Sequence, residues 1–291
     1  MNKNYYDAFG LNICSIGIPD ETADNAMKDI LPDVTIRFGK VNLSTDELIK
    51  ENFKVTKDSI YINDNIAKVK IYKGREIVID PDDNVDKNIF APQILGTPLA
   101  LLLHQRGLLV LHGSAVEVNG SATGFLGHSG MGKSTTIFAL YKNGFNFFAD
   151  EFIVIKLNDE GLPTVFPGFP ILKLSKDIIS NFSNDLSISN LISVPNSDKY
   201  SYKIDQRAIK TSLPLKQVYV IDKGKKTRVN ELKPQEALIN LLEHSYCIGF
   251  KNLYDVQILS MCTNLVKNIK IDSLEIPHSF EKLSEIVRIV K

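Results

Sequence analysis

Apolar and polar positions alternate through much of the N-terminal part of the chain. The pattern covers residues 59–64, 66–72 and 76–80, and Gly, Asn and Asp bound the runs. A period of two in β-branched and aromatic residues predicts β-strands. The sequence Pro-Asp-Asp-Asn at 81–84 then ends the pattern. We therefore expect a β-rich N-terminal region over residues 1–87.

A helix is predicted to follow, from about Asn88 to Arg106. It ends before Gly107, a residue type that is common just past a helix end. Its most apolar part, 94–103, contains a glycine and a proline and is too short to span a bilayer. We interpret it as a buried helix.

The middle of the chain predicts two strands, a loop, a helix and another strand. Residues 107–118 form an apolar strand run, Asn119-Gly120 predicts a tight hairpin turn, and 121–127 continues as the second strand. Apolar residues at helical spacing follow over 133–141, and 145–157 is typical of a strand interrupted by one acidic pair.

Polar residues dominate the segment after Gly161. Residues 175–202 are rich in Ser, Asn and Asp, which predicts a short helix and then a long surface excursion, a lid or an acceptor-binding loop. The pattern then favours a strand over 215–222, a hairpin-like turn over 222–229, and amphipathic helices over 234–246 and 254–267.

Composition excludes several classes of function. The 34 Lys and Arg residues balance 34 Asp and Glu, so no overall field attracts nucleic acid or an anionic membrane. Cys14, Cys247 and Cys262 are far apart in sequence, which argues against a zinc site or a disulfide framework. The N-terminus has no apolar signal segment. We expect a cytoplasmic protein.

The loop between the second strand and the helix, GHSGMGKS at 127–134, fits the phosphate-binding pattern G-x-x-x-x-G-K-[ST]. Glycines let successive N–H groups turn toward an anion, the lysine neutralises phosphates, and the last serine can bind Mg²⁺. A simple Gly-rich turn is the plainer reading, but the strand before the loop and the helix after it favour nucleotide binding. The residues expected to bind ATP are Gly127, Ser129, Gly130, Met131, Gly132, Lys133, Ser134 and Thr135.

Three more residues are candidates for chemistry. Asp150 and Glu151 end a short apolar strand, where a parallel neighbour would bring them to the loop's edge of the sheet. One carboxylate there could hold a metal and the other could accept a proton; the alternative is an exposed acidic turn. His112 lies in an apolar strand, where a hydrogen-bonded core residue is the commoner interpretation. His128 is assigned no catalytic role.

The order of LHGSAV (111–116), GHSGMGKS (127–134) and FADE (148–151) resembles the core of the HPr kinase/phosphorylase family. The resemblance implies an α/β fold: an HPr-kinase-like P-loop domain, related to phosphoenolpyruvate carboxykinase, over residues 88–291. PGFPILKLS (167–175) and the segments 214–222 and 231–246 are similar to a divergent branch. Its members are often encoded with lasso-peptide biosynthesis enzymes, and some phosphorylate the precursor peptide on its C-terminal serine.

The resemblance implies roles for three residues. Asp150 would take the proton of the acceptor serine, and His112 would orient the acidic cluster. Glu151 would be the second acid of the pair, near Mg²⁺. The loop motif itself assigns Ser134 to Mg²⁺ and Lys133 to the phosphates of ATP. The family usually has Asp at the second acidic position, so Glu151 is a departure that could shift the metal.

The segment 167–175 departs further from the bifunctional enzymes. It replaces their glutamate-containing signature, and Ile171 stands where the divergent branch often has an arginine, so we do not expect reverse phosphorolysis. Lys173, Lys203 and Arg207 are candidates to neutralise the transferring phosphoryl group, although each is also typical of a solvated surface cation.

The predicted function is therefore an ATP- and Mg²⁺-dependent serine kinase that acts on a peptide or small protein. The resemblance is also compatible with a homo-oligomer. Two alternatives stay open: a kinase for a small hydroxylated metabolite such as free serine, and a non-catalytic module that binds a nucleotide for regulation. No partner among nucleic acids or membranes is expected.

Overall fold

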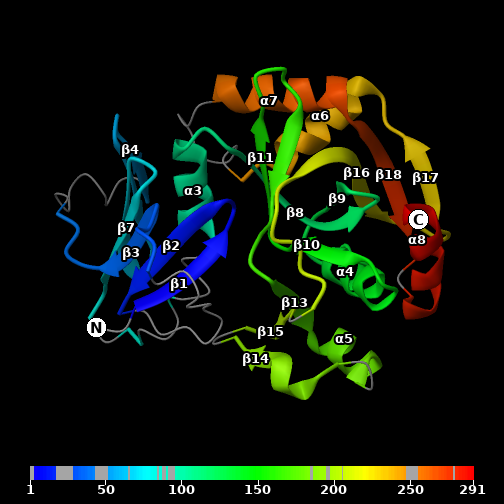
Figure 1. Cartoon of the computed structure of the whole chain (residues 1–291), viewed down its shortest axis with the longest axis horizontal. Coiled ribbons are helices and arrows are strands. Elements are labelled where there is room, and N and C mark those ends of the chain that lie inside the picture. Colours follow the sequence, from blue (N-terminus) through cyan, green and yellow to red (C-terminus); the bar gives the residue numbers. More distant parts are fainter. Residues whose placement is uncertain are drawn as a thin grey trace. The chain divides into compact units, whose positions relative to one another are not determined.

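The chain divides into two compact units. The structure, a computed structural model, describes residues 3–17, 29–42, 52–64, 66–83, 85–86, 90, 96–183, 186–194, 197–204, 206–246, 255–277 and 279–291. By its contacts, Met1–Leu108 with Tyr246–Asp255 forms the first unit, and Leu109–Ser245 with Val256–Lys291 forms the second (Figure 1). The sequence places the boundary between 87 and 88, ahead of the helix. That helix, α3 (Thr97–Gln105), contacts strands of the first unit.

The first unit is built on a seven-stranded sheet in the order β1-β2-β3-β7-β6-β5-β4. Its strands are β1 (Lys3–Ala8), β2 (Leu11–Ile16), β3 (Val34–Phe38), β4 (Phe53–Val55), β5 (Ser59–Asn63), β6 (Ala67–Tyr72) and β7 (Glu76–Pro81). The last three are the strands that the alternating pattern predicts. The pairs β2–β3 and β3–β7 are parallel, and the others are antiparallel. Helix α3 contacts β6 and β7; of its predicted start, 88–89 and 91–95 lie outside the described residues.

The second unit contains a small closed barrel. Its ring runs β8–β11–β12–β16–β9 and back to β8, with β10 on the other side of β8 and with β18 and β17 extending from β16. The strands are β8 (Leu109–Val118), β9 (Ser121–Leu126), β10 (Asn146–Ala149), β11 (Phe152–Leu157), β12 (Pro163–Phe166), β16 (Leu213–Lys223), β17 (Arg228–Glu231) and β18 (Lys270–Ile276). The chain is thus a mixed α/β protein with a β-rich N-terminal sheet.

The sequence predicts two hairpin turns between these strands, and the strand pairing confirms one of them. The predicted hairpin is present: Val118 pairs with Ser121, and Asn119 and Gly120 both have positive φ, 50° and 76°, as a tight two-residue turn requires. The predicted hairpin over 222–229 is wrong. Strand β18 inserts between β16 and β17, parallel to the first and antiparallel to the second.

Two glycines leave room for an isoleucine inside the barrel. A methyl group added at Gly113 or at Gly124 would lie 2.9 Å from Ile153 Cδ1, closer than real Cβ contacts come. Gly113 therefore needs to be glycine, because a methyl group there would also lie 2.8 Å from the backbone oxygen of Phe125, whereas at Gly124 the Ile153 side chain would have to shift. The alternation also sets the direction of neighbouring side chains: Gly113 faces the interior, so His112 and Ser114 face outward.

Helix α4 (Lys133–Lys142) fills the space beside the barrel. It contacts β8, β10, β13 and α8 (Leu283–Val290), and Ile137, Phe138 and Leu140 are fully buried. The apolar residues of α8 recur at helical spacing, so one face of that helix packs into the same core. Packing on both sides fixes the position of the loop that precedes α4.

The polar segment after 170 contains a second small sheet. Strands β13 (Ile171–Ser175), β15 (Lys199–Lys203) and β14 (Leu191–Ser193) pair in that order, with α5 (Lys176–Asn181) and the short helix η4 (Ile188–Asn190) between β13 and β14. The predicted short helix is α5. The predicted surface excursion is wrong in part, because Leu186 and Tyr202 are buried in the core around α4.

Of the remaining helices, α6 (Pro234–Glu243) and α7 (Asp255–Asn268) follow the prediction closely, whereas the short η5 (Phe280–Lys282) and α8 were not predicted. Within the described ranges, no helix is both long enough and apolar enough to cross a bilayer. Cys14 and Cys262 are buried free thiols, and Cys247 lies outside the described residues.

Candidate phosphate-binding site and acidic pair

Strand β8 brings the glycine loop and the acidic pair to the same level. Leu126, the last residue of β9, pairs with Gly113, and Ala149, the last residue of β10, pairs with Ala115. The sequence predicted that a parallel neighbouring strand would bring Asp150 and Glu151 to the edge of the sheet where the loop lies. Instead, β8 lies between β9 and β10 and runs antiparallel to both, so their carboxyl ends meet across it.

The loop 127–132 has the backbone of an anion cradle. Gly130 and Gly132 have φ values of 80° and 96°, in the left-handed region that favours glycine. Gly132 also caps α4 and has no side chain to occupy the first N–H groups of the helix. These donors and the helix dipole are what a phosphate group binds at a helix N-terminus.

Lys133 lies at the first position of α4 and is only 9% exposed. Its ammonium donates to the carbonyl oxygens of Gly127 and His128, the second at 3.3 Å. Burial lowers the pKa of this lysine, and the charges of Asp150 and Glu151 partly oppose that shift. An ammonium that donates to neutral carbonyls can exchange them for a phosphate oxygen, which forms a stronger, charge-assisted bond.

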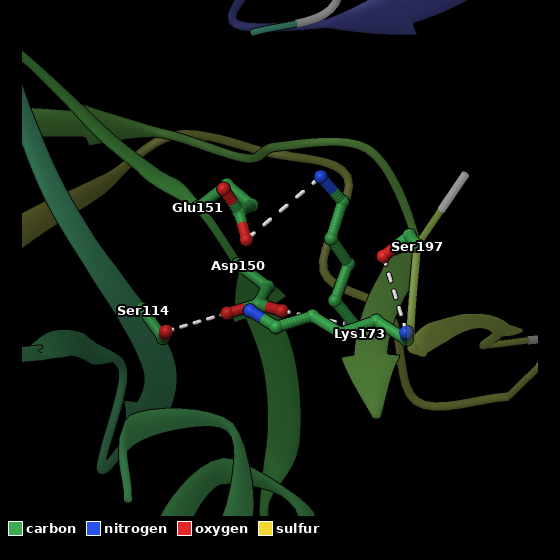
Figure 2. Close-up of polar contacts among 6 residues, drawn as sticks. Ser114, Asp150, Glu151, Lys173 and Ser197 are labelled. Atoms are coloured by element: carbon green, nitrogen blue, oxygen red, sulfur yellow. Dashed lines mark hydrogen bonds and ion pairs between the residues drawn. The ribbon is translucent and has the colours of Figure 1, made fainter. Parts of the chain in front are cut away.

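Asp150 is held in place through both of its oxygens. It lies opposite Ser114 across β8 and β10, and Oδ1 accepts the Ser114 hydroxyl at 2.6 Å. Oδ2 accepts the backbone N–H of Lys173 at 2.9 Å (Figure 2). Burial raises the pKa of Asp150, as does the charge of Glu151, while these two hydrogen bonds favour the ionised form. The result is an oriented carboxylate with increased proton affinity.

Glu151 reaches the cavity through an unusual backbone conformation. Its φ is 70°, and its Oε1 lies 3.8 Å from Lys173 Nζ (Figure 2). Each of these two side chains is 29% exposed. A partly exposed pair at this distance contributes little to stability, about 1 kcal/mol or less. The carboxylate therefore remains available as an oxygen ligand.

His112 is half-buried on the outward face of β8. Its backbone N–H donates to the carbonyl of His244 at 2.7 Å. Burial, reinforced by the charge of Lys133, lowers the pKa of His112 to about 4. The imidazole is therefore neutral at pH 7. The His128 ring is exposed and lies 5.1 Å from the His244 ring, centroid to centroid.

These residues line one cavity of about 430 Å³ in the second unit. Of the predicted site residues, it contains all except Gly127: His112, Ser129, Gly130, Met131, Gly132, Lys133, Ser134, Thr135, Asp150 and Glu151. The rest of the lining was not predicted, apart from Lys173, and comprises Ser175, Asp177, Ile178, Asn181, Lys199, Lys223, Ile276, Pro277, Ser279, Phe280 and Leu283. The structure thus brings the loop, the acidic pair and the histidine together.

Of the three predicted cations, only Lys173 lines this cavity. The Arg207 guanidinium lies over the Tyr141 ring instead, 4.3 Å from its centroid. Lys203 is exposed at the end of β15, four residues from Lys199. Alternation in β15 is the signal that could have identified Lys199, since Tyr202 is buried and Lys199 lies on the opposite face.

Ser134 and Glu151 both line the cavity, and each carries a side-chain oxygen of a kind that binds Mg²⁺. Among the described residues, no group of three or more His, Cys, Asp or Glu side chains could hold a metal ion by itself. Mg²⁺ is usually held by one or two protein oxygens together with water and substrate phosphates. The pair of residues therefore fits a Mg²⁺ ion that arrives with a nucleotide, and does not fit a metal held by the protein alone.

No family model matches the chain, and no curated protein matches it. The chain is similar to the solved structure of the Hpr(Ser) kinase/phosphatase from Coxiella burnetii, with 12% sequence identity and a TM-score of 0.32. The alignment covers 62% of this chain and 93% of that one. At this TM-score the similarity does not establish a shared activity.

Proposed function

We propose that this protein is an ATP- and Mg²⁺-dependent kinase that phosphorylates a serine hydroxyl of a peptide or small protein. One observation carries the proposal: the phosphate-type loop and the oriented carboxylate of Asp150 line the same cavity. A nucleotide-binding module needs the loop alone. A carboxylate that already accepts a serine hydroxyl, that of Ser114, supplies the second function a kinase requires.

The residues have distinct tasks in this proposal. The N–H groups at the start of α4 and the ammonium of Lys133 bind the phosphates and neutralise their charge. Asp150 accepts the proton of the serine hydroxyl as the oxygen attacks the γ-phosphorus, and Ser114 and the Lys173 N–H keep it oriented. Ser134 and Glu151 would hold the metal. Mg²⁺, when bound, further neutralises the phosphates and aligns them.

His112 acts through its neighbours and not as a charged group. It lines the cavity on the same face of β8 as Ser114, and its lowered pKa keeps the ring neutral at the pH of the reaction. A neutral imidazole there adds no positive charge beside Lys133. It can orient the acidic pair by hydrogen bonding, in line with the role that the sequence motifs imply.

The acceptor is the part of the proposal that needs an experiment first. The protein is incubated with Mg²⁺ and ATP labelled in the γ-phosphate, together with three kinds of acceptor: an HPr-type protein, peptides that end in serine, and free serine. Matched acceptors with alanine in place of serine serve as controls. We expect label in a phosphoserine of a protein or peptide and none in the alanine versions.

Two other results would replace the proposal. Label in free serine alone would assign a metabolite kinase. Tight ATP binding without any labelled product over hours, across the whole acceptor panel, would assign a nucleotide-binding module. Asp159→Asn changes an exposed turn carboxylate outside the cavity and controls for unspecific effects of removing an acidic group.

A further inference from the structure

The small sheet of β13 and β15 presents its polar face to the cavity. Lys173 pairs with Ser201, and Ser175 pairs with Lys199. Alternating residues point to one side of a strand, so Lys173 and Lys199 share a face, while Leu172, Leu174 and Tyr202 enter the core on the other. The two lysines are diagonal neighbours on that face, about 7–8 Å apart at their backbones.

The two lysines differ in what their ammonium groups contact. The Lys173 ammonium faces Glu151 at 3.8 Å, and the Lys173 backbone N–H holds Asp150. The Lys199 backbone N–H donates to Ser197 Oγ at 3.1 Å. The Lys199 ammonium makes no hydrogen bond or ion pair with any residue that the structure describes. It is an uncommitted cation in a cavity that has a phosphate-type loop.

We infer that Lys199 is a catalytic residue that contacts the γ-phosphoryl group during transfer. The inference rests on the proposed kinase function and assigns the cation that the sequence left open. Lys199 belongs to the wall that carries Lys173, and this wall is bonded directly to Asp150. The phosphoryl group nearest Asp150 is the one being transferred, because Asp150 binds the hydroxyl that attacks it.

Electrostatics inside the cavity agrees with this placement. Four lysines, Lys133, Lys173, Lys199 and Lys223, line the cavity with three carboxylates, those of Asp150, Glu151 and Asp177. The charge of Lys199 contributes to the lowered pKa of both Lys133 and His112. A polyanion bound between Lys133 and Lys199 would relieve the repulsion between their ammonium groups. Lys223 is exposed at the end of β16.

The transfer step shows what Lys199 would contribute. The bond between the γ-phosphorus and the bridging oxygen to the β-phosphate breaks, and a bond from the γ-phosphorus to the serine oxygen forms. The serine proton moves to Asp150, and the bridging electron pair stays on ADP. Charge is spread over the equatorial oxygens of the phosphoryl group during this step. A cation on those oxygens stabilises the transition state more than the ground state.

Nucleotide affinity tests the inference without an acceptor. Lys199→Met removes the charge and keeps the length of the side chain, and Lys176→Met is the matched control. Lys176 is exposed, pairs with Asp198 next to Lys199, and does not line the cavity. We expect Lys199→Met to weaken ATP binding about 10- to 100-fold while ADP binding changes less than about twofold. Both nucleotides should bind Lys176→Met as they bind the wild type.

Kinetics with the acceptor then separates transition-state from ground-state contacts. We expect kcat of Lys199→Met to fall about 10²- to 10³-fold with the acceptor KM unchanged, and Lys199→Arg to recover a large part of the loss. Equal losses of ATP and ADP affinity, or kcat equal to that of Lys176→Met, would overturn the inference. A wild-type protein that transfers phosphate to no acceptor would instead defeat the proposed function, while ATP discrimination by Lys199 could still be measured.

Discussion

The substitution Asp150→Asn separates the chemical role of the acidic pair from its structural role. An asparagine has the same shape as the aspartate, and it can keep both neighbours. Its amide oxygen can accept the Lys173 N–H, and its amide NH₂ can donate to the Ser114 hydroxyl, which rotates to accept. The variant therefore loses the basic carboxylate with little change in the local hydrogen bonds.

The size and sign of two effects follow from the environment of Asp150. Losing a general base typically costs about 10²- to 10⁴-fold in rate, or about 3–5.5 kcal/mol in the activation free energy. The same substitution should increase the stability of the folded state. Burial and the charge of Glu151 raise the folded-state pKa above the ordinary value of 3.8, so the folded state pays a penalty for the ionised carboxylate at neutral pH.

This penalty has a defined pH dependence. With a raised folded-state pKa, Asp150 stabilises the fold fully only below pH 3.8, and that contribution is lost as the pH rises through the folded-state pKa. Asparagine does not titrate. We therefore expect Asp150→Asn to have an equal or higher Tm than the wild type at pH 7, by about 2–4 °C for each kcal/mol relieved, with the difference shrinking toward pH 4.

The assay combines transfer of labelled phosphate with thermal unfolding between pH 4 and 8. Asp159→Asn, in the exposed turn after β11, should change neither measurement. Wild-type transfer by Asp150→Asn would refute its assignment as the base. A large fall in Tm at pH 7 together with lost activity would show that the carboxylate is structural, and would refute the reasoning on its penalty.

Two further predictions use the loop and the histidine. Gly130 and Gly120 have similar φ values, 80° and 76°, and a methyl group at either position would meet nothing within 4 Å. Alanine at each position should lower the free energy of unfolding by about 1–2 kcal/mol. Only Gly130→Ala should also weaken ATP binding, as measured by titration calorimetry. Equal ATP affinities of the two variants would argue against the cradle. The depressed pKa of His112, about 4 against 6.5, means that stability falls as the pH drops from 6.5 to 4. His112→Gln should flatten this slope in denaturant unfolding, and an unchanged slope would contradict the neutral imidazole.

Local signals in the sequence predicted the parts of the site that depend on short-range geometry. Asn119-Gly120 fixes the hairpin register, and that register places the end of β9 opposite Gly113. The interruption of a strand by Asp150 and Glu151 was also predicted, and it separates β10 from β11. In each case the residue type dictates the local backbone conformation, so neighbours in sequence suffice to predict it.

Long-range pairing could not be predicted in the same way. The barrel closes because β16 pairs with both β9 and β12, and nothing in the residues of β16 specifies these partners. The polar segment 175–202 was misread for a related reason. Its strands alternate lysine or serine with leucine or tyrosine, and such a strand is assigned only once the core that buries its apolar face is known. Lys199 was missed with it.

The backbone at Glu151 explains how two adjacent carboxylates come to line one cavity. Strict alternation would point Asp150 outward, beside Ser114, and Glu151 inward with Ile153, opposite Gly113. An ionised carboxylate inside the apolar barrel would cost several kcal/mol. The left-handed conformation at Glu151, with φ of 70°, costs about 1–2 kcal/mol and turns the side chain to Lys173 instead. Because the left-handed backbone costs less than a buried charge, the strain at Glu151 is retained. This strain places a second carboxylate beside the candidate base.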